Sequence, residues 1–253
     1  MLRRLAALWL IAALATVASV QAAPLEVDAA FTHADLDRQL VLLEDPTGAL
    51  AFEQVRARSD FAAPGPKGAN LGFTGSAWWA RVDLRIPAPA GKPRVRVIGA
   101  NFPNGQAPDS DKFVYKMRWL DALREWVRAE LAAHPRLVLL GDYNITFDDL
   151  DVWDPVGLAG TIHCTDEERT HLKALIDLGL SDAFRLFPQP EKSFSWWDYR
   201  MLGYQKNRGL RIDHILVSEA LRPLVKACTI DRVPRKWDKP SDHTPVVVDL
   251  LQA

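Results

Sequence analysis

The chain has 253 residues, of which 48% are hydrophobic and 25% are charged, and its formal net charge is −1. This length fits one large domain or two small ones, and the composition predicts a packed core rather than a disordered chain. The near-neutral balance neither requires nor excludes a nucleic-acid partner, because a binding surface can be local. The only cysteines, Cys164 and Cys228, lack metal-type spacing, so we expect two buried thiols and no disulfide scaffold, with a single disulfide between them left open.

Residues 1–22 are predicted to be an export signal. Arg3 and Arg4 precede an apolar run from Leu5 to Val20, and small residues follow it. The run is short for a membrane span, which needs roughly 20 apolar residues. We therefore expect a periplasmic or exported protein without a membrane attachment after cleavage, and an uncleaved anchor helix is the alternative.

Residues 23–93 are predicted to form a small β-rich segment. The apolar run Leu40–Leu43 is closed by turn-forming residues at Glu44–Gly48. In Ala77–Ile86, apolar and polar side chains alternate as they do in a half-buried strand. Pro87–Pro93 has the composition of a linker or wide turn.

Residues 94–253 are predicted to form an α/β domain, because strands and helices alternate along them. Trp119, Leu120, Leu123, Val127 and Leu131 recur at helical spacing, and Thr165 and Glu168 form a capping box that starts another helix. Ser218 is placed to cap a short helix through Val225. The predicted strands are 95–98, 137–140, 193–199, 212–217 and 246–250, and the two longer helices are 118–134 and 165–178.

Three predicted strand ends carry oxygen or imidazole groups. These are Asp142 and Asn144 after one strand, Asp213 at the start of another, and Asp242 with His243 before the last. Each alone has a plain structural explanation as a turn former, a cap or an ion pair. Together they favour a site for Mg²⁺ or Mn²⁺, which bind hard oxygen ligands, and the absence of a HExxH or cysteine cluster argues against zinc.

The C-terminal part resembles the exodeoxyribonuclease III and abasic-endonuclease branch of the endonuclease/exonuclease/phosphatase superfamily. The resemblance covers about Val95 to Leu250 and is carried, in order and spacing, by four motifs: Gly141–Asn144, Ser193–Arg200, Asn207–His214 and Lys239–His243. It implies part of a four-layer, two-sheet α/β sandwich of the DNase I type. It also implies Mg²⁺-dependent hydrolysis of double-stranded DNA at abasic sites and 3′ ends, with no obligate protein partner.

The resemblance also implies roles for single residues. Asp142 would activate the attacking water or protonate the leaving oxygen, and Asn144 would hold the phosphate and the neighbouring metal. His243 would contact the scissile phosphate and be oriented by Asp213, and Asp242 would help to bind the metal. The predicted catalytic residues are thus Asp142, Asn144, Asp213 and His243, and the predicted metal ligands are Asp142, Asn144, Asp242 and His243.

The same resemblance implies a DNA-binding surface. Trp196, Leu210 and Ile212 would wall a pocket for a flipped-out abasic sugar, although core packing explains the last two equally well. Arg211 would meet DNA phosphates, together with Arg200, Lys206 and Arg208. A solvated basic loop is the plainer explanation of these charges.

The sequence departs from the family in its first half. Residues 1–94 contain neither an Asn-x-Asn-Gly-like motif nor the Gln-Glu pair whose glutamate is the family's main metal ligand, and Asn101 stands where the family has a catalytic tyrosine. Glu26, Glu44 and Glu53 lack the expected context.

Leu43–Gly48 and Gly72–Arg81 instead resemble an extracellular sensor module of bacterial membrane receptors. The alternative to a nuclease is therefore an exported sensing or binding module, or a fused gene, whose nuclease half is inert. If the N-terminal segment is a misjoined gene model, we expect the nuclease to be cytoplasmic.

Overall fold

The structure, a computed structural model, describes residues 25–26, 40–47, 50, 54–55, 57–65, 77–81, 84–85 and 95–251. It divides into two compact units, residues 1–90 and 91–253. The predicted signal at 1–22 and the predicted linker at 87–93 lie outside the described residues. Within the described part of the chain, no helix combines the length and the apolar character that a membrane crossing requires.

The N-terminal unit contains two small sheets. Strand β1 (Leu25–Glu26) pairs in parallel with β4 (Leu84–Arg85), and β2 (Val41–Asp45) pairs antiparallel with β3 (Ala77–Arg81). The predicted strand 77–86 thus contains two strands, β3 and β4. A small core of Val41, Leu43, Val55 and Phe61 packs against Leu50 and Trp79.

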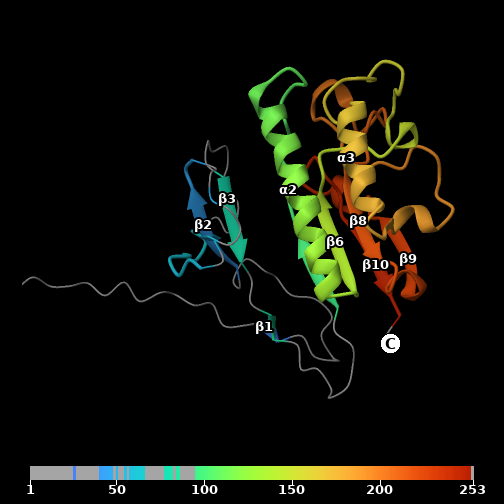
Figure 1. Cartoon of the computed structure of the whole chain (residues 1–253). Coiled ribbons are helices and arrows are strands. Elements are labelled where there is room, and N and C mark those ends of the chain that lie inside the picture. Colours follow the sequence, from blue (N-terminus) through green and yellow to red (C-terminus); the bar gives the residue numbers. More distant parts are fainter. Residues whose placement is uncertain are drawn as a thin grey trace, which may run out of the picture. The chain divides into compact units, whose positions relative to one another are not determined.

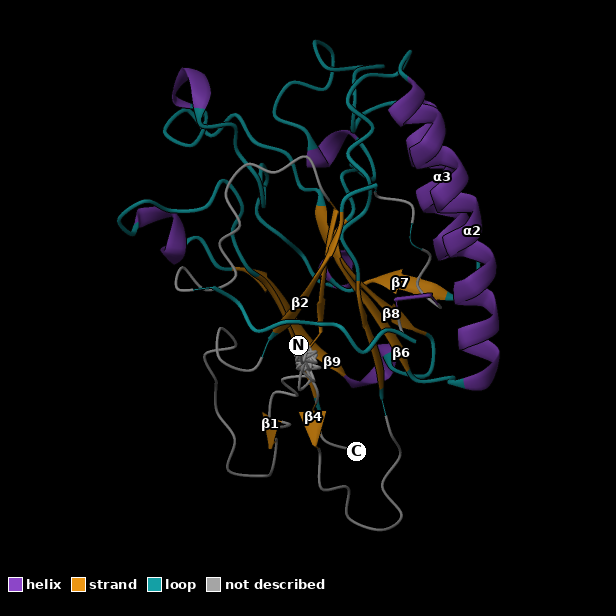
Figure 2. Cartoon of the chain, turned by 90° about the vertical axis from the view of Figure 1, so that its left-hand side faces the viewer, coloured by secondary structure: helices purple, strands orange, loops and turns teal. Residues whose placement is uncertain are grey.

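The C-terminal unit is built on a four-stranded mixed sheet in the order β5-β6-β8-β7. Strands β5 (Arg96–Gly99) and β6 (Leu137–Asp142) are parallel, and β8 (Asp213–Ser218) runs antiparallel to both β6 and β7 (Leu180–Asp182). Helices α2 (Asp111–Ala133) and α3 (Asp166–Ile176) lie side by side over one face of this sheet (Figures 1 and 2).

Alternation along β6 decides which side chain meets which layer. Leu137 and Leu139 belong to the core beneath the helices, whereas Val138 and Leu140 belong to a second core on the opposite face. There the sheet packs against the antiparallel pair β9 (Val225–Ile230) and β10 (Val246–Leu250). The result is an α/β arrangement in which helices, one sheet and a second, two-stranded sheet are stacked. Short helical turns lie at η2 (Asp149–Asp151), η3 (Phe184–Leu186), η4 (Arg200–Leu202), η5 (Arg222–Leu224) and η6 (Val233–Lys236).

Several predicted elements are confirmed, with some bounds moved. Thr165 and Glu168 form the predicted capping box at the start of α3. Helix α2 begins at Asp111, seven residues before the predicted start at Arg118, because the Ser110 side chain caps it by accepting a hydrogen bond from the Phe113 N–H. Both cysteines are free thiols and buried, as expected.

Two predicted elements are wrong. Residues 193–199 form a loop rather than a strand, with isolated bridges from Trp196 to Leu210 and His243. Ser218 caps no helix, because its hydroxyl accepts the Leu137 N–H at 3.0 Å, and the chain continues into β9 after the short turn η5. In both cases a long-range contact takes the place of the local pattern.

Candidate active site

Strand pairing brings the first two carboxylates together. Strands β6 and β8 are antiparallel, and their register places Asp142, the last residue of β6, directly opposite Asp213, the first residue of β8. Gly141, just before, has φ of 140°, and a Cβ there would lie 1.9 Å from the Ala100 carbonyl oxygen. Glycine is therefore required for β6 to end against β5 in this way, and the end of β6 positions Asp142.

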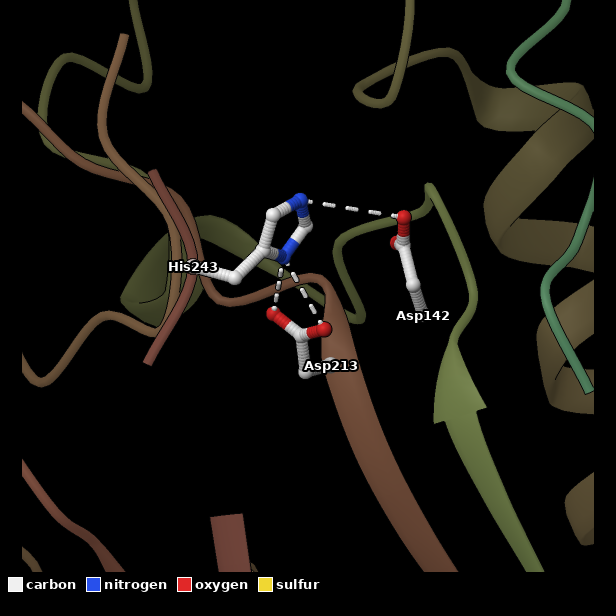
Figure 3. Close-up of side chains that lie close together, drawn as sticks. All are labelled: Asp142, Asp213 and His243. Atoms are coloured by element: carbon white, nitrogen blue, oxygen red, sulfur yellow. Dashed lines mark hydrogen bonds and ion pairs between the residues drawn. The ribbon is translucent and has the colours of Figure 1, made fainter. Parts of the chain in front are cut away.

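His243 lies between the two carboxylates (Figure 3). Its Nδ1 is 3.0 Å and 3.1 Å from the two carboxylate oxygens of Asp213, and its Nε2 is 3.9 Å from an oxygen of Asp142. Because a carboxylate can only accept, Nδ1 carries the proton, so the other nitrogen faces Asp142 and the cavity. Asp213 is held in turn by the Ser195 hydroxyl, which donates at 2.6 Å.

The electrostatics of this trio favour a proton-transfer site. Burial, followed by the negative charge of Asp213, raises the pKa of Asp142 to about 6. Burial opposes the charged form of His243, but its hydrogen bond to Asp213 and the surrounding carboxylates raise its pKa above the ordinary value. Asp142 therefore titrates close to neutrality, where a general acid or base works best.

One ligand atom from each of Asp142, Asp213 and His243 lies within 4.8 Å of the others, which is close enough for a shared cation. Facing carboxylates that repel each other are a fitting donor set for a divalent cation with hard oxygen preference. Asp242 was the predicted ligand in place of Asp213. Its carboxylate faces the same cavity, where it accepts a hydrogen bond from the Trp196 indole at 2.9 Å.

Asn144 is fixed on every side. Its amide nitrogen donates to the Phe102 carbonyl and to Asp142, each at 3.0 Å, and its amide oxygen accepts from Asn104 at 3.1 Å. Its backbone adopts φ of 51°, which turns its carbonyl toward the interior. The amide is thus held at the cavity wall beside Asp142.

A buried polar cluster lies beneath Asn144. The ammonium of Lys116 donates to the Asn144 carbonyl at 2.8 Å and to Glu168 at 2.5 Å, and both side chains of this ion pair are fully buried. The His163 ring donates to the same carbonyl at 2.6 Å, and burial lowers the pKa of His163. This cluster fixes the loop that follows β6.

These groups surround a cavity of about 370 Å³. Six of the predicted site residues line this cavity: Asp142, Asn144, Trp196, Ile212, Asp242 and His243. Three further residues, which the sequence did not indicate, also line the cavity: Phe102, Asn104 and His163. Asn101, the departure from the family's tyrosine, also lines the cavity.

Sequence signals for the missed residues were weak. Asn104 sits in an Asn-Gly pair that is typical of turns, and His163 lies in a stretch without periodicity. Lys116 had a clearer signal, since it occupies a buried position of α2 three residues after Phe113, where a lysine is out of place.

Two predicted substrate-binding residues are not at the surface. Arg211 is 1% exposed, and its guanidinium is held by the carboxylates of Asp151 and Asp182 at 2.7–2.9 Å. It therefore cannot meet DNA phosphates, and its role is to hold the chain behind the site. Leu210 packs in a buried cluster with Val152 and Cys164, beneath Trp196, so it supports the cavity wall without forming it.

Arg211 also fixes the neighbouring His214. Arg211 donates to Nδ1 of His214 at 3.1 Å, and Nε2 of that ring donates to the Ile145 carbonyl at 2.7 Å. Burial and then the charge of Arg211 lower the pKa of His214 to about 4, so this histidine is neutral. It ties β8, which carries Asp213, to the loop that carries Asn144.

The sequence matches the Endonuclease/Exonuclease/phosphatase family over residues 26–243. It is 37% identical over 161 residues to exodeoxyribonuclease III of Haemophilus influenzae, covering 59% of each chain. Among solved structures, it resembles the 3′ phosphatase NExo from Neisseria bound to product DNA hairpin, with 44% identity, a TM-score of 0.61, and 62% of this chain and 61% of that one covered. It also resembles an AP endonuclease from Archaeoglobus fulgidus, with 31% identity, a TM-score of 0.58, and 61% and 60% covered.

The match thus spans about three fifths of the length of these relatives. It places the stacked sheets and helices of the C-terminal unit within the DNase I-like α/β sandwich fold that was expected. The chain belongs to the endonuclease/exonuclease/phosphatase family.

Proposed function

We propose that this chain is a DNA repair nuclease that hydrolyses phosphate esters in double-stranded DNA, at 3′ ends and abasic sites, with Mg²⁺ or Mn²⁺ bound. The observation that carries the proposal is the cluster of Asp142, Asp213 and His243, in which Asp142 and His243 line an open cavity and Asp213 holds His243 from behind. The printed names of the relatives, an exodeoxyribonuclease III, a 3′ phosphatase and an AP endonuclease, support phosphate-ester hydrolysis in DNA.

In this proposal, His243 binds the reacting phosphate. Its Nε2 faces the cavity, and its Nδ1 is held by Asp213, which stabilises the protonated ring next to an anion. The oxygen of the Asn144 amide, which is held by Phe102 and Asn104, gives a second fixed contact, to the metal. A fixed donor such as the His243 ring costs no reorganisation when charge develops in the transition state.

Asp142 transfers the proton. Its carboxyl faces the same cavity, and its pKa of about 6 allows it either to accept a proton from the attacking water or to donate one to the leaving oxygen. A divalent cation held by Asp142 with Asp213 or Asp242 would neutralise the charge of the phosphate and lower the pKa of bound water. The fit rests on the hard oxygen ligands of Asp142 and Asp213, each of which offers an atom within 4.8 Å of the other and of a His243 ring nitrogen.

The first half of the chain limits the expected rate. The family's glutamate ligand is not recognisable in residues 1–94, and Mg²⁺ sites commonly use only one or two carboxylates. Asn101 replaces a tyrosine, and a lost transition-state donor costs roughly 10²–10³ in rate. We therefore expect weak metal binding and slow turnover.

The test is hydrolysis of two labelled duplexes, one with a 3′-phosphate and one with an abasic site, over a wide range of Mg²⁺ and Mn²⁺ concentrations. The matched control is His243→Ala purified in the same way, which removes the phosphate contact and reveals any contaminating nuclease. Metal-dependent product above that control supports the proposal, and a chimera with a complete family first half before Val95 should turn over faster. If the native chain and the chimera both equal the control, the nuclease half is inert, as the alternative of an exported sensing module predicts.

A further inference from the structure

A second cavity opens next to the first. It has a volume of about 410 Å³ and is formed by the segment between η6 and β10, with Trp237, Lys239 and Pro240 in its wall. This volume lies within the roughly 300–1,000 Å³ of small-ligand pockets. His243 lines both cavities, so the two spaces meet at this residue.

The wall of this second cavity carries an unused aromatic surface. Trp237 is 65% exposed, which is unusual for so large an apolar side chain. The guanidiniums of Arg232 and Arg235 stack over Trp197 at 5.0 Å and 5.8 Å instead, and within residues 95–251 no ring or guanidinium covers the Trp237 indole. The indole face is therefore free for a planar ligand.

The charges around Trp237 suit a polyanion. Lys236 directly precedes Trp237, and Lys239 follows it after Asp238; all three charged residues are exposed, so two ammonium groups and one carboxylate flank the indole in the sequence. An aromatic platform next to exposed ammonium groups is the arrangement that binds unpaired nucleic-acid strands, because every base has a π-face and every nucleotide a phosphate. A drug-like or peptide ligand would gain nothing from the neighbouring phosphate site, whereas a DNA strand reaches both.

We propose that this second cavity is a base-stacking subsite, in which Trp237 stacks on an unpaired nucleobase adjacent to the phosphate bound at His243. This inference rests on the proposed function. A base inside a duplex is stacked on its neighbours, so the subsite selects ends that are frayed or mismatched. Trp237 is a specificity-determining residue that acts through binding of the strand, and the trio of Asp142, Asp213 and His243 carries out the chemistry.

The experiment measures binding of the full chain to labelled DNA by fluorescence anisotropy, with Ca²⁺ in place of Mg²⁺. Three DNAs are compared: a duplex with a paired 3′ end, the same duplex with the last nucleotides mismatched, and the mismatched duplex with a base-free sugar analogue next to the terminal phosphate. The wild-type chain should bind the mismatched end best. Trp237→Ala should weaken that complex roughly 5- to 150-fold, the range for one stacked base, and Trp237→Phe should restore most of it.

The base-free DNA makes the test specific. On it, wild type and Trp237→Ala should bind equally, because the stacking partner is already absent. Tyr115→Ala, which removes a half-exposed aromatic from α2 outside both cavities, should leave all three affinities unchanged. Because Trp237 is largely exposed, its truncation should leave the unfolding transition in place.

Equal affinity of wild type and Trp237→Ala for the mismatched end overturns the proposal, as does an equal loss on the base-free DNA. These readouts do not depend on turnover. A chain that binds as expected but hydrolyses nothing contradicts the proposed function alone, and a chain that hydrolyses DNA without any effect of Trp237 contradicts only the subsite.

Discussion

Replacing Asp142 with asparagine should stabilise the metal-free protein at alkaline pH while removing its activity. In the fold, burial and the facing Asp213 raise the pKa of Asp142 from an ordinary value of 3.8 to about 6. Since each pKa unit corresponds to about 1.4 kcal/mol, the charged carboxylate costs the fold about 3 kcal/mol. Asparagine removes that cost and keeps the size of the side chain.

The gain is smaller than the full cost, because asparagine keeps only one acceptor. Asp142 accepts from both the backbone and the side-chain nitrogen of Asn144, at 2.8 Å and 3.0 Å, and asparagine loses one of these bonds. A lost hydrogen bond costs about 1 kcal/mol. The net expectation for Asp142→Asn is a stabilisation of about 2 kcal/mol at about pH 8.

The dependence on pH has a definite sign. A carboxyl group whose pKa is raised in the folded state contributes stability below its unfolded pKa, and that contribution is lost as the pH rises through about 6. The advantage of Asp142→Asn should therefore be full above about pH 7 and fall close to zero by about pH 4.5.

The assay is urea denaturation in EDTA at several pH values, followed by the helical circular dichroism that α2 and α3 dominate. Asp249→Asn, an exposed carboxylate on β10, controls for a general effect of lost negative charge. If Asp142→Asn is less stable than wild type at pH 8, or if its advantage is independent of pH, the fold does not hold the Asp142 carboxylate in an unfavourable environment.

Three further outcomes are expected. Asp213→Asn should lower kcat roughly 10- to 100-fold with little change in KM, which is the usual cost of losing the carboxylate behind a functional histidine. Because Asp213 no longer raises the pKa of His243, the activity of this variant should begin to fall at a lower pH than that of wild type. An unchanged pH profile would remove Asp213 from the mechanism. Lys116→Met should destabilise the C-terminal unit by about 3–5 kcal/mol in urea denaturation, because it leaves Glu168 buried without a cation. Lys116→Met combined with Glu168→Gln should recover part of the lost stability. A cost below about 1 kcal/mol for Lys116→Met would contradict a buried ion pair between Lys116 and Glu168. Mg²⁺ should raise the melting temperature of the wild-type chain, by an amount equivalent to about 2.7 kcal/mol when its concentration is about a hundred times its Kd. The melting temperature of Asp142→Asn should rise less. An equal rise in the two proteins would place the ion at another site.

The local sequence was sufficient to predict those elements whose sequence signals lie within one helical turn or one strand. The capping box at Thr165 and Glu168 was readable because both partners lie within four residues of each other. Strand β10 was predicted with its observed bounds, since its apolar run is closed by Pro245. The motifs around Asp142, Asp213 and His243 were also readable, because hard ligands at strand ends are uncommon in combination, and the structure brings these residues together as expected.

Only the tertiary structure decided the roles of neighbours in the chain. Arg211, Ile212 and Asp213 are consecutive, yet one is buried in an ion pair, one lines the cavity and one holds His243. Successive side chains at the start of a strand point in different directions, and the local sequence does not indicate which distant residues each of them will contact. The prediction for Arg211 was wrong for this reason, since Asp151 lies sixty residues away along the chain.

The buried ion pair beneath the site likewise could not be predicted from the sequence. Lys116 and Glu168 come from different helices, and they meet only because α2 and α3 pack side by side over the sheet. Residue types and their spacing therefore determined the chemistry that this protein can hold, whereas burial and strand register, which arise from contacts between distant segments, decided which side chains perform it.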